Sequence, residues 1–262
     1  MKDGRPSLTA RSVALARSSL ERPHTSSGDP AAEQILYSHL RTPLWWPLLS
    51  ARIGRWVAAR TSFFDQALLG ALTAGITQIV IVGAGYDGRA LRFREPGVRF
   101  FEVDHPATQE DKRRLVESSG TPAGHISYVP LDLTAGDLAS ALVDAGHDPS
   151  APSLFVCEGL LLYLTPLVVD RLLRGLRACG APGSLLALSA RENVLNAPRS
   201  VRARDLVARL TLAAIGEPRR STFAAGELAR RLEQTGWAPV EQVDRGRGRS
   251  GTRGILVLAE PQ

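Results

Sequence analysis

The spacing of apolar residues changes near residue 76 of this 262-residue chain. Before that point apolar residues recur every three or four positions, which is the period of an amphipathic helix. We expect one helix over 8–20 and further helices over 31–75, interrupted by the proline-bounded segment 42–47. The clearest of these runs from Arg52 to Leu72 and stops at Gly75.

After residue 76 short apolar runs alternate with helical stretches. The runs are 78–82, 98–103, 126–130, 153–157 and 184–189, and the helical stretches are 89–94, 106–118, 135–145 and 166–178. Strands that alternate with helices predict βαβ units and a parallel sheet. In such sheets the ligand site lies at the carboxyl ends of the strands.

The alternation ends after the fifth apolar run. Residues 191–220 form a long, basic, partly helical insertion, followed by a helix over 225–235 and two strands over 238–244 and 255–260. Two adjacent strands joined by a turn predict an antiparallel pair. We therefore predict an α/β fold with residues 1–75 as a helical cap and 76–262 as the core, in which 191–221 covers the substrate.

Composition excludes several classes of protein. About 44% of the residues are apolar, which is enough for a substantial core, and no apolar run approaches the roughly 20 residues that a membrane span needs. The N-terminal segment lacks the apolar stretch of a signal peptide. Cys157 and Cys179 match neither a disulfide framework nor a metal site, so we expect a cytoplasmic protein that makes no membrane contact.

The net charge of +6 raises the question of a nucleic-acid partner. Lys2 and Lys112 are the only lysines, and the arginines are spread along the chain rather than clustered. The arginine- and glycine-rich stretch 245–254 is flanked by strand-like residues, so we interpret it as a hairpin turn rather than an RNA-binding tail. The sequence thus disfavours nucleic acid as a partner.

The run "IVIVGAGYDGRALRF" contains a literal G-x-G-x-x-G at 83–88, directly after a predicted strand. Gly83 and Gly85 allow a tight turn and a close approach of the backbone to any ligand, so the motif alone does not identify a dinucleotide. Asp104 ends the second strand, where a carboxylate can accept hydrogen bonds from both ribose hydroxyls. That arrangement suits NAD and an adenosyl ligand equally.

Three features favour the adenosyl ligand. Some 75 residues precede the glycine loop, whereas in many simple NAD enzymes the fingerprint strand lies near the start. The third strand ends in Pro130-Leu131-Asp132-Leu133, an acid with apolar neighbours that can bind an adenine ring. The terminal hairpin makes one sheet edge antiparallel. Together they describe a Rossmann-like class I S-adenosylmethionine methyltransferase, with a mostly parallel seven-stranded sheet, an antiparallel C-terminal hairpin and a helical N-terminal cap.

Six sequence blocks in order carry a resemblance to a known family: "ARTSFFDQAL", "QIVIVGAGYDGRALRF", "FEVDHPATQEDK", "PLDL", "CEGLLLYLTP" and "GEPRRSTFAAGELARRLEQTGW". The chain resembles the leucine carboxyl methyltransferase-like S-adenosylmethionine enzymes, which include many bacterial O-methyltransferases, over about residues 8–260. One departure is Gly88, which replaces the threonine of the usual G-A-G-x-D-T-R loop.

The resemblance implies a role for each matching residue. Arg60 would bind the methionine carboxylate of S-adenosylmethionine, since an arginine fork suits a carboxylate, and Glu158 would face its ammonium group. The other implied cofactor-binding residues are Gly83, Ala84 and Gly85 beneath the methionine, Asp87 shaping the loop, Asp104 on the ribose, and Asp132 with Leu133 on the adenine. Tyr163 would lie near the methyl acceptor and is the catalytic candidate.

The chemistry narrows the acceptor. Methyl transfer from a sulfonium is an in-line displacement that needs alignment and exclusion of water but no metal. A carboxylate acceptor is already ionised near pH 7, whereas a hydroxyl profits from a base. None of the five histidines has a convincing catalytic setting, and this favours a carboxylate. We predict O-methylation of a small, acidic, partly apolar molecule, of the kind found in secondary metabolism.

The alternatives are an NAD-dependent oxidoreductase, for which no nicotinamide-side Tyr/Lys or His pair is evident, and a non-catalytic nucleic-acid-binding member of the fold.

Overall fold

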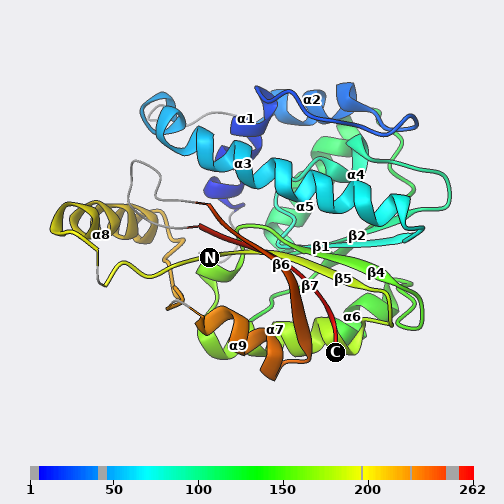
Figure 1. Cartoon of the computed structure of the whole chain (residues 1–262). Coiled ribbons are helices and arrows are strands. Elements are labelled where there is room, and N and C mark those ends of the chain that lie inside the picture. Colours follow the sequence, from blue (N-terminus) through cyan, green and yellow to red (C-terminus); the bar gives the residue numbers. More distant parts are fainter. Residues whose placement is uncertain (1–5, 41–45, 196, 225, 246–253) are drawn as a thin grey trace.

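The structure is a computed structural model that describes residues 6–262 except 41–45, 196, 225 and 246–253 (Figure 1). The turn predicted at 245–254 lies largely outside the described residues. Of the described residues, seven strands form a single sheet in the order β3-β2-β1-β4-β5-β7-β6. The strands are β1 (Gln78–Val82), β2 (Arg99–Asp104), β3 (Ile126–Pro130), β4 (Ser153–Cys157), β5 (Leu185–Arg191), β6 (Trp237–Arg245) and β7 (Gly254–Pro261).

The first five strands are parallel, and β7 pairs antiparallel with both β5 and β6. The predicted α/β fold, with its mixed sheet and C-terminal hairpin, is therefore confirmed. The helices are α1 (Leu8–Ser18), α2 (Pro30–Ser38), α3 (Trp46–Thr73), α4 (Arg89–Arg92), α5 (Pro106–Ser118), α6 (Leu138–Asp144), the 3-10 turn η1 (Leu161–Tyr163), α7 (Pro166–Ala178), α8 (Arg199–Ala214) and α9 (Glu227–Gln234).

The sheet is covered on both faces, which explains why its central strands are continuous apolar runs. Along β1, Ile79 and Ile81 enter one apolar cluster while Val80 and Val82 enter the other, as the two-residue period of a strand requires. Helices α1 to α5 lie on one side of the sheet, and α6, α7 and α9 on the other (Figure 1).

The N-terminal helices share an apolar cluster with the sheet. Ala14 of α1, Leu36 of α2 and Phe64 of α3 are buried in the same cluster as Ile79 of β1. The structure thus places these helices directly over one face of the sheet. Their role as a separate cap remains a prediction.

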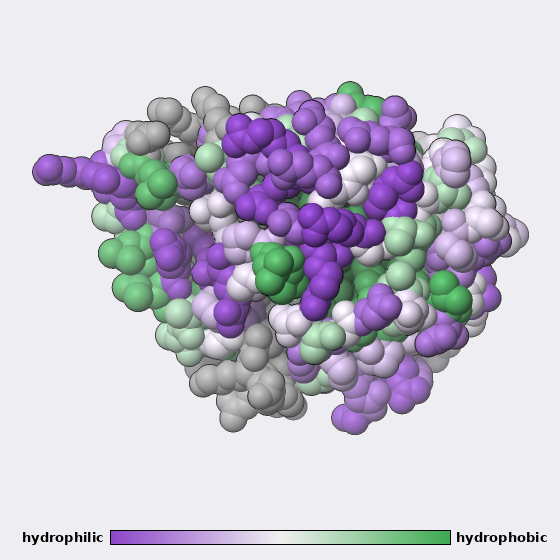
Figure 2. Space-filling view, turned by 90° about the horizontal axis from the view of Figure 1, so that it is seen from below, coloured by the Kyte–Doolittle hydropathy of each residue, from purple (hydrophilic) through white to green (hydrophobic). Residues whose placement is uncertain are grey.

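Helix α8 stands away from this core (Figure 1). It exposes Leu206, Val207 and Leu210, and apolar side chains gather at the corresponding left side of Figure 2. Asp205 fastens α8 to the following loop through an ion pair with Arg219 at 2.8 Å. In the part of the chain that the structure describes, no helix has the length and apolar content to cross a membrane.

Candidate functional site

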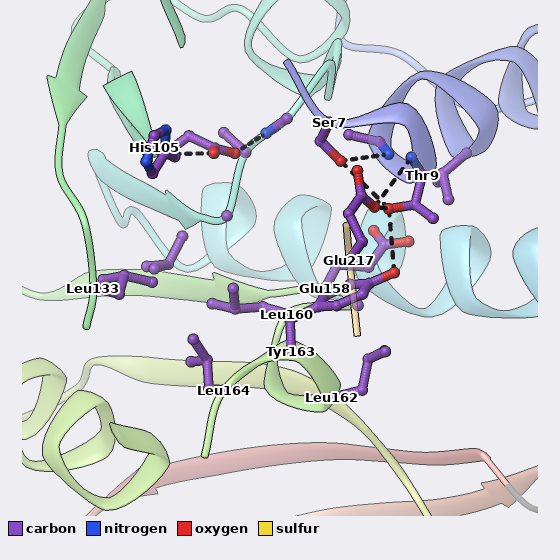
Figure 3. Close-up of a pocket in the computed structure, with 18 of the residues that line it drawn as sticks. Ser7, Thr9, His105, Leu133, Glu158, Leu160, Leu162, Tyr163, Leu164 and Glu217 are labelled. Atoms are coloured by element: carbon purple, nitrogen blue, oxygen red, sulfur yellow. Dashed lines mark hydrogen bonds between the residues drawn. The ribbon is translucent and has the colours of Figure 1, made fainter. Parts of the chain in front are cut away.

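A cavity of about 580 Å³ opens at the carboxyl ends of the parallel strands. Its walls come from α1, from the loops after β1, β2, β3 and β4, and from the loop after α8 (Figure 3). All ten site residues predicted from the sequence line this one cavity: Arg60, Gly83, Ala84, Gly85, Asp87, Asp104, Asp132, Leu133, Glu158 and Tyr163. Right-handed crossovers in a parallel sheet bring these distant segments to the same edge.

The glycine loop needs glycine for two independent reasons. Gly83 and Gly85 have φ angles of 70° and 51°, in the left-handed region that other residues rarely adopt. A Cβ atom at Gly83 would lie 2.9 Å from Leu160, and one at Gly85 would lie 2.7 Å from the side chain of Ala10 in α1. The loop is therefore packed tightly between α1 and the segment after β4.

Asp104 is half-buried at the end of β2. Its Oδ2 accepts a hydrogen bond from the Gly85 N–H at 2.5 Å and its Oδ1 accepts one from the His105 N–H at 2.6 Å. Burial raises the pKa of this carboxyl, although the two N–H groups oppose the shift. Because a carboxylate has about four acceptor positions, Asp104 retains capacity for hydroxyl donors in the cavity.

Asp132 and Leu133 follow β3 on the cavity wall. Asp132 is exposed, and its Oδ1 accepts hydrogen bonds from the N–H of Thr134 at 2.8 Å and from its hydroxyl at 2.7 Å. Hydrogen bonding from Thr134 lowers the pKa of Asp132. The side chain of Leu133 lies on the same stretch of cavity wall as the side chain of His105 (Figure 3).

Three arginines converge on Glu158, directly after β4. Arg17 and Arg89 reach its Oε2 at 2.6 Å, and Arg60 reaches its Oε1 at 2.7 Å. All four side chains are less than one-tenth exposed. Burial alone would raise the pKa of Glu158, but the three guanidinium groups outweigh it and hold that pKa well below its ordinary value.

Asp87 joins the same network from the glycine loop. Its Oδ2 pairs with Arg89 at 2.5 Å and with Arg17 at 3.2 Å, and its Oδ1 accepts from the Arg89 N–H at 2.9 Å. Burial opposes ionisation, but Arg89 and Arg17 lower the pKa of Asp87 to about 2. Arg89 also pairs with Asp65 of α3 at 2.7 Å. Arg17 and Arg89 thus fix the loop to the cavity floor, a role the sequence did not reveal.

The departure at Gly88 has a local structural counterpart. A Cβ atom there would collide with the side chain of Glu33 in α2. Glu33 is fully buried and pairs with Arg22 at 2.6 Å and with Arg92. The space of a threonine side chain is therefore taken by a buried ion-pair cluster that joins α2 to α4.

Glu217 is a further cavity residue that the sequence did not reveal. It lies after α8, is 6% exposed and lines the cavity. Its Oε1 accepts from the Leu8 N–H at 2.8 Å, and its Oε2 accepts from the Thr9 N–H at 3.3 Å and from the Thr9 hydroxyl. The hydroxyl of Tyr163 donates to the Thr9 oxygen at 3.2 Å (Figure 3). The only signal of Glu217 in the sequence is an acid within the block "GEPRRSTF". The neighbouring arginines make that block look like a charged surface segment.

Comparisons with known proteins identify the family and the fold. The family described as leucine carboxyl methyltransferase matches residues 29–177, more than half of the chain. A protein of Mycolicibacterium gilvum named "Putative S-adenosyl-L-methionine-dependent methyltransferase" is 42% identical over 146 residues, which are 55% of this chain and 47% of that protein. A protein of the same name from Mycobacterium avium is 41% identical over 133 residues. The matched part of this chain spans about half the length of these curated relatives.

Two solved structures show the same fold. A DUF574-family protein from Streptomyces avermitilis superposes with a TM-score of 0.63 at 17% identity, covering 99% of both chains. Magnesium protoporphyrin IX methyltransferase from Synechocystis, solved with bound S-adenosylhomocysteine, superposes with a TM-score of 0.56 at 10% identity, covering 88% of this chain and 94% of that one. At these identities the likeness concerns the fold, which is that of Rossmann-like class I methyltransferases.

Proposed function

This chain belongs to the leucine carboxyl methyltransferase family, and from that premise we propose that it transfers the methyl group of S-adenosylmethionine to an oxygen atom of a small molecule. The observation that carries the proposal is the pair formed by Glu158 and Arg60, buried at the floor of the cavity with 2.7 Å between Oε1 and Nε. A methionine moiety carries an ammonium and a carboxylate on one carbon, so adjacent anionic and cationic side chains match both of its charges.

The charges of the pair suit this ligand better than they suit a dinucleotide pyrophosphate. Glu158 stays ionised because Arg17 and Arg89 hold its pKa low, so it retains its charge when Arg60 turns to a ligand carboxylate. Glu158 offers an anion for the ammonium group of a methionine moiety, a group that a dinucleotide pyrophosphate lacks. The floor therefore supports the adenosyl-methionine ligand over NAD.

The other end of the cavity fits the adenosine. Asp104 would accept the ribose hydroxyls, while Asp132 and Leu133 would hold the edge and face of the adenine. Gly83 and Gly85 would let the main chain approach the ligand, because any side chain there meets Leu160 or Ala10. When bound, S-adenosylmethionine supplies an electrophilic methyl group on a sulfonium sulfur.

The acceptor region supports a small, partly apolar molecule. Leu160, Leu162 and Leu164 line the cavity beside Tyr163 (Figure 3), and Arg220 adds a positive charge to its wall. Helix α1 covers the cavity with Thr9, Ala10 and Val13, which would exclude water from the reacting atoms. A hydroxyl or a carboxylate oxygen can serve as nucleophile in such a site.

Calorimetry with S-adenosylmethionine, S-adenosylhomocysteine and NAD tests the proposal on the intact chain. We expect binding of both sulfur ligands and none of NAD. Binding of NAD alone would support the oxidoreductase alternative. Retention on heparin with a steep salt dependence, and no binding of either sulfur ligand, would support the nucleic-acid-binding alternative.

A further inference from the structure

Tyr163, Thr9 and Glu217 form one chain of hydrogen bonds along the acceptor end of the cavity (Figure 3). Its members come from η1, from α1 and from the loop after α8. Thr9 and Glu217 are more than 200 residues apart in the sequence. Resting on the proposed O-methyl transfer, we propose that this chain is a proton relay and that the methyl acceptor is therefore a hydroxyl group, an alcohol or a phenol.

The direction of the relay follows from the inventory of donors. An ionised carboxylate only accepts hydrogen bonds, so the Thr9 hydroxyl must spend its single proton on Glu217. The Thr9 oxygen can then only accept, and the Tyr163 hydroxyl donates to it at 3.2 Å. The Ser7 hydroxyl lies 3.3 Å from the same oxygen and also hydrogen-bonds Glu217. All protons of the chain point toward Glu217.

This direction selects the acceptor. The single proton of Tyr163 is committed to Thr9, so the tyrosine has none to offer an acceptor carboxylate. Its oxygen still has a free acceptor position, and an O–H group of the acceptor can donate to it. A carboxylate acceptor would instead meet a lone pair on Tyr163 and the negative charge of Glu217 behind it.

The main chain fixes the two ends of the relay relative to one another. The N–H of Arg220 donates to the carbonyl of Leu162 at 2.7 Å, and the hydroxyl of Ser221 donates to the carbonyl of Leu161 at 2.6 Å. These bonds seat the loop that carries Glu217 on η1, which carries Tyr163. The relay is thus built into the packing of the loop against η1.

Two arginines nearby are paired with other carboxylates, so Glu217 remains available as the proton acceptor. Arg219, which precedes Arg220 in the same loop, is paired with Asp205 at 2.8 Å, and Arg60 of α3 is held by Glu158. Burial raises the pKa of Glu217, with the N–H groups of Leu8 and Thr9 opposing the shift. A carboxylate with a raised pKa is a stronger base, which suits it to take up a proton at neutral pH.

The acceptor oxygen forms a bond to the methyl carbon, the bond from that carbon to sulfur breaks, and its electron pair stays on sulfur. The acceptor proton moves to Tyr163, the Tyr163 proton to Thr9, and the Thr9 proton to Glu217. Tyr163 is the catalytic residue, since it touches the acceptor, while Thr9 and Glu217 act through it. Glu217 later releases the proton to solvent.

Methyl acceptors that carry both a hydroxyl and a carboxylate test the inference directly. We would supply hydroxybenzoates, hydroxycinnamates and 3-hydroxy fatty acids, with S-adenosylmethionine labelled in the methyl group. Mild alkali releases the label of a methyl ester but not that of a methyl ether. We expect alkali-stable label. Alkali-labile label would overturn the hydroxyl assignment and keep the O-methylation, whereas no transfer by protein that binds the donor would count against both.

Variants of Thr9 distinguish a proton relay from a purely structural hydrogen bond between α1 and the loop after α8, the alternative that we call a clamp. Thr9→Val keeps the shape and the N–H bond but removes the hydroxyl, and we expect turnover to fall roughly 100-fold or more, the usual worth of proton transfer. Thr9→Ser should restore it. Calorimetry should show unchanged donor binding in both. Full turnover of Thr9→Val on a hydroxyl acceptor would overturn the relay.

Glu217→Gln adds a second readout that a clamp would not change. The wild-type rate should fall on the acid side, where Glu217 becomes protonated, and this limb should vanish in Glu217→Gln together with most of the turnover. The amide oxygen can still accept from the Leu8 N–H, but the amide NH2 cannot accept from the Thr9 N–H, so the midpoint of thermal unfolding should fall modestly. An unchanged acid limb in the variant would contradict the role of Glu217.

Discussion

Arg17 of α1 donates to Glu158 after β4 across 2.6 Å, with both side chains about 4% exposed or less. The first helix of the chain is thereby bonded to the floor of the cavity that it also covers. Since Arg60 of α3 and Arg89 of α4 share the same carboxylate, Glu158 joins α1, α3 and α4. The state of this single side chain therefore affects both folding and ligand binding.

We expect Glu158→Gln to destabilise the protein by about 3–5 kcal/mol at pH 7, because three buried guanidinium groups lose their anion. Urea unfolding of the variant measures this value. Glu233→Gln, on the exposed side of α9, is the matched control and should change the stability little. A loss no larger than that of the control would show that the buried pairs add nothing net.

The same carboxylates predict an acid limit to stability. The folded-state pKa of Asp87, about 2, lies below its ordinary value of 3.8, and the pKa of Glu158 is also held well below its ordinary value. The stability they contribute is therefore complete above about pH 5, beyond the unfolded-state pKa values, and is lost as the pH falls toward 2. Urea titrations between pH 6 and 2.5 should show a steeper loss in the wild type than in Glu158→Gln, and parallel curves would contradict the assignment.

Arg60→Lys keeps the charge but cannot make a two-pronged contact with a carboxylate. We expect S-adenosylmethionine to bind roughly ten- to a hundredfold more weakly, which corresponds to about 1.5–3 kcal/mol for a charged hydrogen bond. Calorimetry measures the affinity. Arg113→Lys, on the exposed face of α5, serves as the control. Equal affinities for the Arg60 variant and the wild type would remove Arg60 from the cofactor site.

Asp104→Ala leaves the ribose hydroxyls without their acceptor at a half-buried position, so the affinity for S-adenosylmethionine should fall by about 1–3 kcal/mol. Asp132→Ala should cost less, because Asp132 is exposed and water can replace it. Calorimetry on the two variants gives the order of effects. The reverse order would shift the main contact from the ribose to the adenine.

Chelation should leave methyl transfer intact. The leaving sulfur already carries a positive charge, so its displacement needs orientation rather than a Lewis acid. Turnover measured with labelled donor should be the same with and without EDTA. Loss of activity in EDTA that magnesium restores would overturn the metal-free reaction.

Local patterns were enough to predict most of the elements and the sheet edge at which the candidate site lies. The apolar runs around Gly83 and Glu158 have the length of buried strands, and acids at strand ends fall at the same sheet edge by topology alone. The position of β7 between β5 and β6 depends on pairing between distant segments, which periodicity does not encode. The contacts of Arg17 and Glu217 could not be predicted for the same reason. Each residue looks like a surface charge until its distant partner is known.

A test on Gly88 and Glu33 asks whether the side chain of Glu33 is the reason that glycine replaces the usual threonine at position 88. Gly88→Thr places a side chain where Glu33 lies, so we expect a loss of about 1–3 kcal/mol from overpacking. Glu33→Asp shortens that side chain and keeps its charge, and the double variant should lose less than the sum of the two single variants. Urea unfolding of all four proteins closes a double-mutant cycle. Additive losses would mean that the two positions do not compete for space, and the glycine would then need another explanation.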